Sequence, residues 1–236
     1  MGFGPVSSVA EPNLYSYPLA MPETPAECSP NLTEGRDPAK SAACSLSAGV
    51  AEFIEQLAAP TPTPAGGSAS GAAAAMAAGL ACMVAAISRG KKAHLQHESR
   101  FSEALSRLTT LRQELTSAID ADAESYQAVM KACKMARDSS GGRREMNAAL
   151  RGATRVPLGV AEKAAEVAGI ATVLRSITSP SMKSDLTIAI ALARATCEGS
   201  LTNVRVNLDL IKPDSPEEQS FVSETRKRAE ALNVQA

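Results

Sequence analysis

Apolar residues recur every three or four positions along a stretch that begins at Phe101 and runs to about Ala136. This spacing predicts one long amphipathic helix with a single face toward a core. A carboxylate, Asp122, interrupts the apolar face between Ile119 and Tyr126. The complete stripe consists of Phe101, Leu105, Leu108, Arg112 with Leu111 beside it, Leu115, Ile119, Asp122, Tyr126, Val129 and Cys133.

A second long helix is expected from about Ser184 to Ile211, where apolar residues follow the same spacing. Its apolar stripe consists of Leu186, Ile190, Ala193, Cys197, Leu201, Val204, Leu208 and Ile211. Beside it runs a neutral polar stripe, made of Thr196, Ser200, Asn203 and Asn207. Uncharged hydrogen-bonding groups are typical of a semi-buried interface or of a site for a ligand with several donors and acceptors.

Weaker patterns predict three further helices. A short amphipathic helix carries Val50, Phe53, Ile54 and Leu57, and prolines from Pro60 onward end it. A helix from about Arg143 to Ala168 contains Pro157, where we expect a bend, and a shorter segment follows it to Ile177. The last helix, about Glu217 to Leu232, is expected to be solvated.

The segment from Ala65 to Ser88 contains no charged residue. Its length is compatible with a membrane span. However, its first half consists mostly of Ala, Gly and Ser, whose transfer into lipid gains little free energy. We therefore expect a helix that is buried on all sides by closely packed neighbours, and no membrane association.

These elements predict an all-α fold: a single-domain helical bundle with a central helix rich in small residues. Aromatic residues make up only 3% of the chain, which suits helices packed through small side chains. Residues 1–45 contain seven of the fourteen prolines and no apolar period. We expect this part to be a disordered N-terminal tail, and residues 46–236 to form the domain.

Composition excludes several classes of function. The net charge of -1, without a basic block, argues against binding to nucleic acid. The five cysteines are scattered without CxxC spacing, so neither a disulfide framework nor a zinc site is indicated. The N-terminus lacks the pattern of a secretory signal or transit peptide, and we expect a cytoplasmic protein. The two histidines, His94 and His97, are too few for a metal site or a hydrolase triad.

Asp122 is the leading candidate for chemistry. On a helix, Asp120 and Glu124 point away from the stripe and can reach water, whereas Asp122 faces inward. One interpretation is a structural carboxylate that bonds to a neighbouring helix. The other is a catalytic group, because partial burial would raise its pKa and suit it to general acid/base chemistry near neutral pH. The pattern alone leaves both open.

Two further features could bind an anion. Gly66, Gly67 and Ser68 open the uncharged helix, where exposed N–H groups and the helix dipole would attract negative charge. A simple capped helix start is the alternative. Lys91 and Lys92 follow that helix, and their alternative interpretation is a solvated turn.

Taken together, these segments resemble the cyclodeaminase/cyclohydrolase family, and they occur in the family's order from about Glu52 to Ala231. The matching segments are PTPAGGS (62–68) with the small-residue run after it, SRGKK (88–92), IDADAESYQAVMKA (119–132), VPLGVAE (156–162), KSDLTIAIALA (183–193) and GSLTNVRVNL (199–208). Each segment is weakly specific, but the combination is specific.

The resemblance implies an enzyme that acts on one-carbon units of tetrahydrofolate, without a tightly bound cofactor, and that assembles as a homodimer. It selects Asp122, the second Asp of the DADAE motif, as the catalytic residue. The implied substrate-binding residues are Gly66, Gly67, Ser68, Lys91, Lys92, Asp185, Asn203 and Asn207.

The resemblance leaves three functions to compare. The first is closure of 5-formiminotetrahydrofolate to 5,10-methenyltetrahydrofolate with release of ammonia. The second is a methenyltetrahydrofolate cyclohydrolase, and the third is a non-catalytic helical scaffold or ligand-binding protein. The chain departs from the family pattern at Ala65, where a glycine is usual, at His94 in place of an aromatic residue, and at Ser179 in place of Asn.

Overall fold

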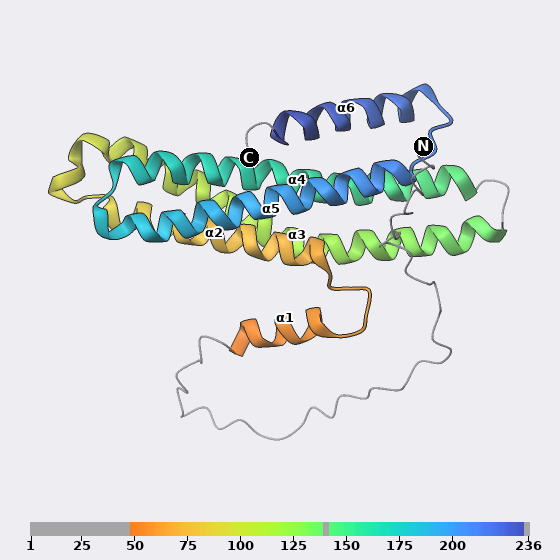
Figure 1. Ribbon diagram of the computed structural model, residues 1–236, viewed down its shortest axis with the longest axis horizontal. Helices are drawn as coiled ribbons and strands as arrows, with labels where there is room; N and C mark the ends of the chain where they lie inside the picture. Colours follow the sequence, from red (N-terminus) through yellow and green to blue (C-terminus); the bar gives the residue numbers. More distant parts are fainter. Residues whose placement is uncertain (1–47, 139–141, 234–236) are drawn as a thin grey trace, which may run out of the picture. The chain divides into compact units, whose positions relative to one another are not determined.

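The structure is a computed structural model that describes residues 48–138 and 142–233 (Figure 1). The described elements all belong to one unit, Ser45–Ala236. The tail predicted for residues 1–45 lies outside the described residues. The helices are α1 (Ala48–Ala58), α2 (Gly66–Ser88), α3 (Glu98–Asp138), α4 (Gly142–Ile177), α5 (Lys183–Leu210) and α6 (Pro216–Asn233), with two short 3-10 helices, η1 (Lys92–His97) and η2 (Pro180–Met182).

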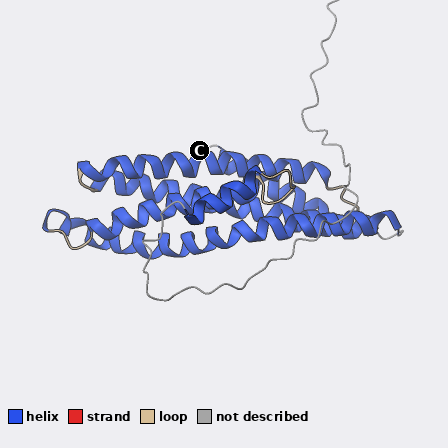
Figure 2. Ribbon diagram, turned by 90° about the horizontal axis from the view of Figure 1, so that it is seen from below, coloured by secondary structure: helices blue, strands red, loops and turns tan. Residues whose placement is uncertain are grey.

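Four long helices, α2 to α5, lie side by side and form the bundle, as both ribbon views show (Figures 1 and 2). The described residues contain helices and no strands, which confirms the predicted all-α class. The core is built from alanine, leucine and valine, and it includes Phe101, Leu108, Leu111 and Leu115 of α3 at 0% exposure. The apolar stripe predicted for α3 therefore faces the core over its first half.

Close packing between α2 and α3 depends on small side chains. Gly71 of α2 is buried, and a Cβ atom there would lie 3.3 Å from both the Ile119 side chain and the Leu115 carbonyl oxygen. Larger residues would push the two helices apart. This contact sets α3 close against the first turns of α2, where Asp122 follows one turn after Ile119.

α4 differs from the expected two segments because it continues without a break from Gly142 to Ile177. The predicted interruption after Ala168 is wrong. Ala171 and Leu174 are buried at helical spacing from Val167, and their packing in the core outweighs the low helix propensity of Gly169.

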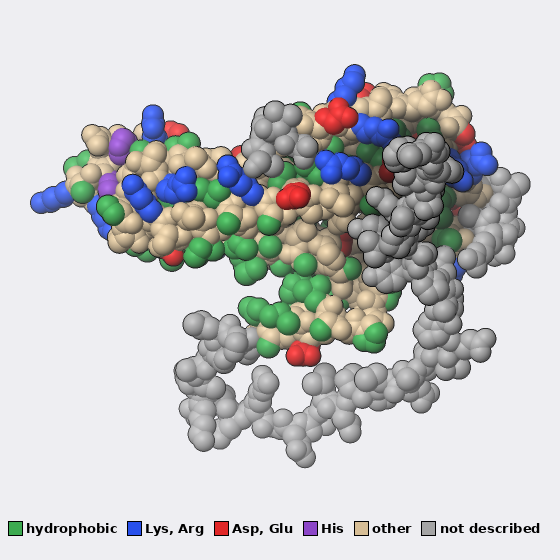
Figure 3. Space-filling view, in the orientation of Figure 1, with side chains coloured by type: hydrophobic (Ala, Val, Ile, Leu, Met, Phe, Trp, Pro, Cys, Tyr) green, Lys and Arg blue, Asp and Glu red, His purple; other side chains and the backbone are tan. Residues whose placement is uncertain are grey.

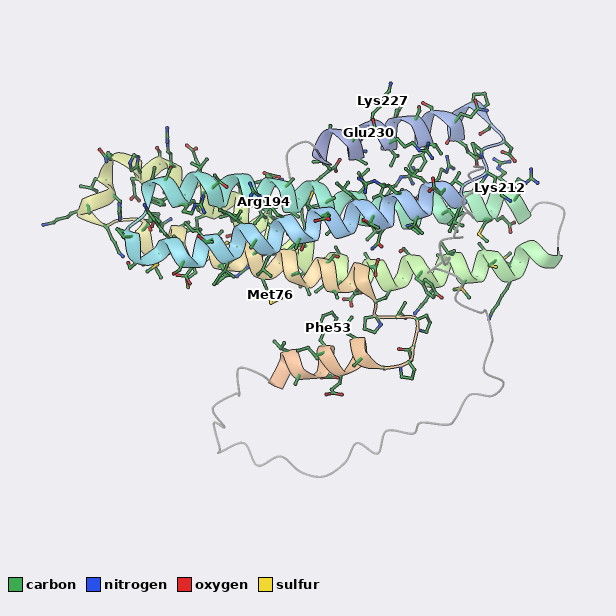
Figure 4. All side chains as sticks on the ribbon, viewed as in Figure 1. Phe53, Met76, Arg194, Lys212, Lys227 and Glu230 are labelled. Carbon is green, nitrogen blue, oxygen red and sulfur yellow. The ribbon has the colours of Figure 1, made fainter. Side chains whose placement is uncertain are left out.

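α2 is only partly enclosed, so the expectation that it is buried on all sides is wrong for a single chain. Ten of its residues are buried, but Met76, Met83 and Ile87 are 54%, 39% and 40% exposed. Met76 points out of the bundle in Figure 4, and hydrophobic side chains gather along this side of α2 in Figure 3. We call the row of Met76, Leu80, Met83 and Ile87 the α2 stripe.

α2 is also the one helix among the described residues that is long and apolar enough to cross a membrane. It packs against α3, α4 and α5, as the core helix of a bundle does. α6 packs on α4 and α5, where the buried Asn147 side chain donates to the Glu218 carboxylate and to the Lys212 carbonyl, each at 2.8 Å.

Candidate active site

A cavity of about 280 Å³ opens where the N-terminus of α2 meets the middle of α3, the first half of α4 and the C-terminal half of α5. It brings together five residues that the sequence selected: Gly66, Gly67, Asp122, Asn203 and Asn207. The rest of its wall is uncharged and consists of Pro62, Thr63, Ala65, Ser125, Tyr126, Val129, Leu150, Ala153, Pro157, Val206 and Leu210.

Asp122 is half-buried in this wall and is held by one residue of α2. The Ser68 hydroxyl lies 3.1 Å from Asp122 Oδ2, and the Ser68 backbone N–H also donates to the carboxylate. Ser68 is the third residue of α2, and α2 begins after Ala65, whose side chain has no capping group. Asp122 therefore caps α2 from another helix, because it accepts the N–H that an N-cap side chain ordinarily takes.

Gly67 allows this approach. A Cβ atom built on Gly67 would overlap the Asp122 carboxylate, whereas one built on Gly66 would meet nothing within 4 Å. The two adjacent glycines are thus different in function: the first faces open space and the second provides the room for the carboxylate. The sequence pattern identified both as a pair and could not separate them.

Burial raises the pKa of Asp122, and the hydroxyl and backbone hydrogen bonds from Ser68 partly oppose that rise. The net shift is upward because desolvation is the larger effect. The positive end of the α2 dipole also stabilises the ionised form of the carboxylate. A carboxyl group with a raised pKa that lines a cavity is a candidate to exchange protons with a ligand.

This shift predicts how folding stability depends on pH. Since the folded-state pKa of Asp122 lies above its unfolded-state pKa, its favourable contribution is complete below the unfolded-state pKa and is lost as pH rises through the folded-state pKa. We therefore expect the unfolding free energy of the wild type, relative to that of Asp122→Asn, to fall as pH rises from the unfolded-state pKa to the folded-state pKa. Urea denaturation of both proteins from pH 4 to pH 7 measures it, and a difference that increases with pH would contradict the assignment.

Pro157 explains the position of Asn207. A proline lacks the N–H that would bond to the carbonyl four residues earlier, so Pro157 leaves the Ala153 carbonyl of α4 without its helical partner. The Asn207 side-chain NH₂ donates to that carbonyl at 2.9 Å. The bond fixes the Asn207 amide at the cavity wall and leaves its Oδ1 atom to accept from a ligand. Asn203 lines the cavity one turn earlier on α5.

The other sequence-selected residues lie elsewhere in the chain. Lys91 and Lys92 follow the C-terminus of α2, and a helix of 23 residues is about 34 Å long, so they are remote from Asp122 in the same chain. Asp185 lies in the first turn of α5, near the same far end, where Ser88 and Thr178 share a hydrogen bond of 2.9 Å. His94 packs edge-on against Phe101.

Ser68 touches Asp122 but has 0% exposure, so it lies behind the cavity wall and does not face a ligand directly. Sequence reasoning missed Ser125 and Tyr126 as wall residues, although they follow Asp122 by three and four positions, the spacing that places residues on one helix face. It also treated Pro157 only as a bend and did not connect it with Asn207.

Comparison with known proteins shows which family the chain resembles. A family model described as formiminotransferase-cyclodeaminase matches residues 49–231. A methenyltetrahydrofolate cyclohydrolase from Methylorubrum extorquens is 29% identical over 188 residues, which cover 78% of this chain and 88% of that protein. The formimidoyltransferase-cyclodeaminase of Sus scrofa is 28% identical over 188 residues, and the match spans about a third (34%) of that longer protein.

The fold agrees as well. The crystal structure of formiminotetrahydrofolate cyclodeaminase from Thermotoga maritima superposes with a TM-score of 0.67 at 28% identity, covering 79% of this chain and 92% of that one. These relatives are named as enzymes of two types, cyclodeaminase and cyclohydrolase. The match of the family model over most of the chain and the shared fold show that this chain belongs to the formiminotransferase-cyclodeaminase family and is an enzyme of one of these two types.

Proposed function

We propose that the protein is a cytoplasmic folate enzyme that closes 5-formiminotetrahydrofolate to 5,10-methenyltetrahydrofolate and releases ammonia. The observation that supports it most is the position of Asp122: a half-buried carboxylate with a raised pKa in a cavity whose other lining residues carry no charge. Such a group can transfer a proton without competition from other acids or bases among the described wall residues, apart from the Tyr126 hydroxyl.

In this reaction a second nitrogen of the folate adds to the formimino carbon and forms a new C–N bond. The bond between that carbon and the terminal formimino nitrogen then breaks, and this nitrogen leaves as ammonia. Asp122 accepts the proton of the attacking nitrogen and donates a proton to the leaving amine, so its own protonation is restored. The cavity holds the two reacting atoms in line, which removes most of the entropic barrier. Asn207 Oδ1 and the Asn203 side chain offer hydrogen bonds to the polar edge of the ring system.

The second candidate is methenyltetrahydrofolate cyclohydrolase, favoured by the Methylorubrum extorquens relative, of which the match covers 88%. There the same carboxylate would activate water. The absorbance of methenyltetrahydrofolate separates the two reactions: its appearance from formiminotetrahydrofolate together with ammonia supports the first, and its decay supports the second. No change with either substrate would overturn both.

We also propose that two copies of the chain complete the site. The α2 stripe is exposed and apolar, and α2 has no charge along its length. In a two-fold pairing whose axis crosses α2 near its midpoint, next to Met76, the two α2 helices would run antiparallel. The C-terminal end of one α2 would then lie beside the N-terminal end of the other. Lys91 and Lys92 of one chain would thus approach the Asp122 cavity of its partner, where they could bind the carboxylates of a folate.

A charge introduced into the middle of the α2 stripe tests whether two chains pair through this surface. We expect Met83→Glu to convert a dimer into a monomer in sedimentation experiments, because a buried carboxylate without a partner opposes association. Turnover should fall with dimer content. Gln219→Glu, at an exposed position of α6, should change neither property. A wild type that sediments as a monomer while it is fully active would contradict the proposal.

A further inference from the structure

The Ser68 hydroxyl can donate only one hydrogen, but two acceptor atoms lie within hydrogen-bond distance of it. Its Oγ atom lies 3.0 Å from the Ile119 carbonyl oxygen and 3.1 Å from Asp122 Oδ2. The side chain is completely buried, so the hydroxyl cannot donate to bulk water in place of these two acceptors. A single hydrogen cannot form a strong bond to both acceptors at once, and which of them receives it depends on their relative strength.

The protonation state of Asp122 decides which of the two acceptors is the stronger. An ionised carboxylate is about twice as strong an acceptor as a neutral oxygen, so it takes the hydrogen from the Ile119 carbonyl. A protonated Asp122 loses this advantage, and the nearer Ile119 carbonyl then receives the hydrogen. In either state the buried hydroxyl has a partner, so neither state leaves it unsatisfied.

The surroundings leave Ser68 as the main polar group that responds to this charge. α2 contributes no charged residue, and the described wall residues of α4 and α5 are Leu150, Ala153, Pro157, Asn203, Val206, Asn207 and Leu210. On α3 itself, Ser125 donates to the Asp122 backbone carbonyl at 2.8 Å and not to the carboxylate. Tyr126 is the other titratable residue of the described wall.

We propose that Ser68 is a positioning residue whose hydroxyl hydrogen moves between the Ile119 carbonyl and Asp122 as Asp122 gains and loses its proton. The inference rests on the proposed catalytic function of Asp122. When Asp122 gives its proton to the departing amine, the O–H bond breaks and its electron pair stays on the carboxylate. The Ser68 hydrogen turns to Oδ2 and stabilises that new charge. When Asp122 is protonated again, the hydrogen returns to Ile119.

The direct test follows the Asp122 carboxyl group itself. Protein labelled with ¹³C at aspartate side-chain carboxyls is titrated by NMR, and the resonance that is absent from Asp122→Asn identifies residue 122. We expect Ser68→Ala to move the titration midpoint of Asp122 to higher pH, because the ionised form loses its hydroxyl donor. Ser70→Ala, a serine of the same helix whose side chain lies near Gly199, is the matched control and should leave the midpoint unchanged.

Activity gives a second readout. We expect turnover of Ser68→Ala to fall roughly tenfold, and the limb of the pH profile that reports Asp122 to move to higher pH. Ser68→Cys, which keeps the volume but donates weakly, should move both in the same direction and serves if the alanine variant does not fold. A Ser68 with only a structural role would lower thermal stability and leave the midpoint in place, which would overturn the proposal. The NMR titration needs no substrate, so a failure of the folate function would be recognised separately.

Discussion

Asp122→Asn is expected to reduce turnover at least about a hundredfold while the protein stays folded, because an amide cannot exchange the proton that the reaction requires. Asparagine has nearly the same shape, and its Oδ1 still accepts the Ser68 N–H that Asp122 accepts now. We therefore expect the melting temperature to change by only a few degrees. Turnover at matched concentrations of folded protein, followed by methenyl absorbance, measures the effect.

Two variants separate catalysis from capping. Asp120→Asn makes the same chemical change at an exposed position two residues away and should leave turnover near the wild-type value. Asp122→Ala removes the acceptor as well, and we expect it to destabilise the protein by about 1 kcal/mol through the lost cap. If Asp122→Asn retains full turnover, Asp122 is a structural carboxylate and not a catalytic group.

Gly67→Ala is expected to lower turnover by a similar factor, although the substitution replaces no titratable residue. The new Cβ atom would occupy the space of the Asp122 carboxylate and force it away from Ser68. Alanine is the better helix former by about 1 kcal/mol, so we expect little loss of stability. A displacement of about 1 Å is enough to reduce turnover about a hundredfold. We therefore expect a large fall in kcat together with only a small change in melting temperature.

Gly66→Ala is the matched control for this prediction. It makes the same change in the same turn of α2, but its Cβ atom would meet nothing within 4 Å. Because Gly66 itself lines the cavity, we expect a smaller loss of turnover than in Gly67→Ala, together with a slightly higher melting temperature. Equal losses in both variants would mean that the helix start, and not the space for Asp122, controls activity.

Much of the fold was predictable because the periodicity of apolar residues reports burial directly. The stripe from Phe101 to Leu115 faces the core as expected, and the position of Asp122 in that stripe places it toward the inside of the bundle. Asp120 and Glu124 are exposed, as the helical geometry required. Local spacing thus identified the candidate residue before any neighbouring helix was known.

The remaining features depend on contacts between helices that no local pattern records. The distinction between Gly66 and Gly67 requires the position of α3, and the bond from Asn207 to Ala153 requires α4 and α5 to be side by side. The family resemblance also grouped Lys91, Lys92 and Asp185 with Asp122, although the length of α2 separates them from Asp122 within one chain. A one-dimensional motif shows which residues occur and not how far apart they lie.

The claim that folate chemistry takes place in the Asp122 cavity is tested most directly by calorimetric binding of tetrahydrofolate to the wild type and to Val206→Trp. Val206 is half-exposed at the cavity wall, so an indole there would fill the space without contact to the core. Arg205→Trp, the adjacent exposed position that does not line the cavity, is the control. We predict that the wild type and Arg205→Trp bind alike and that Val206→Trp binds at least about tenfold more weakly, a loss of about 1.4 kcal/mol. Equal binding by all three proteins would place the folate elsewhere and contradict the account.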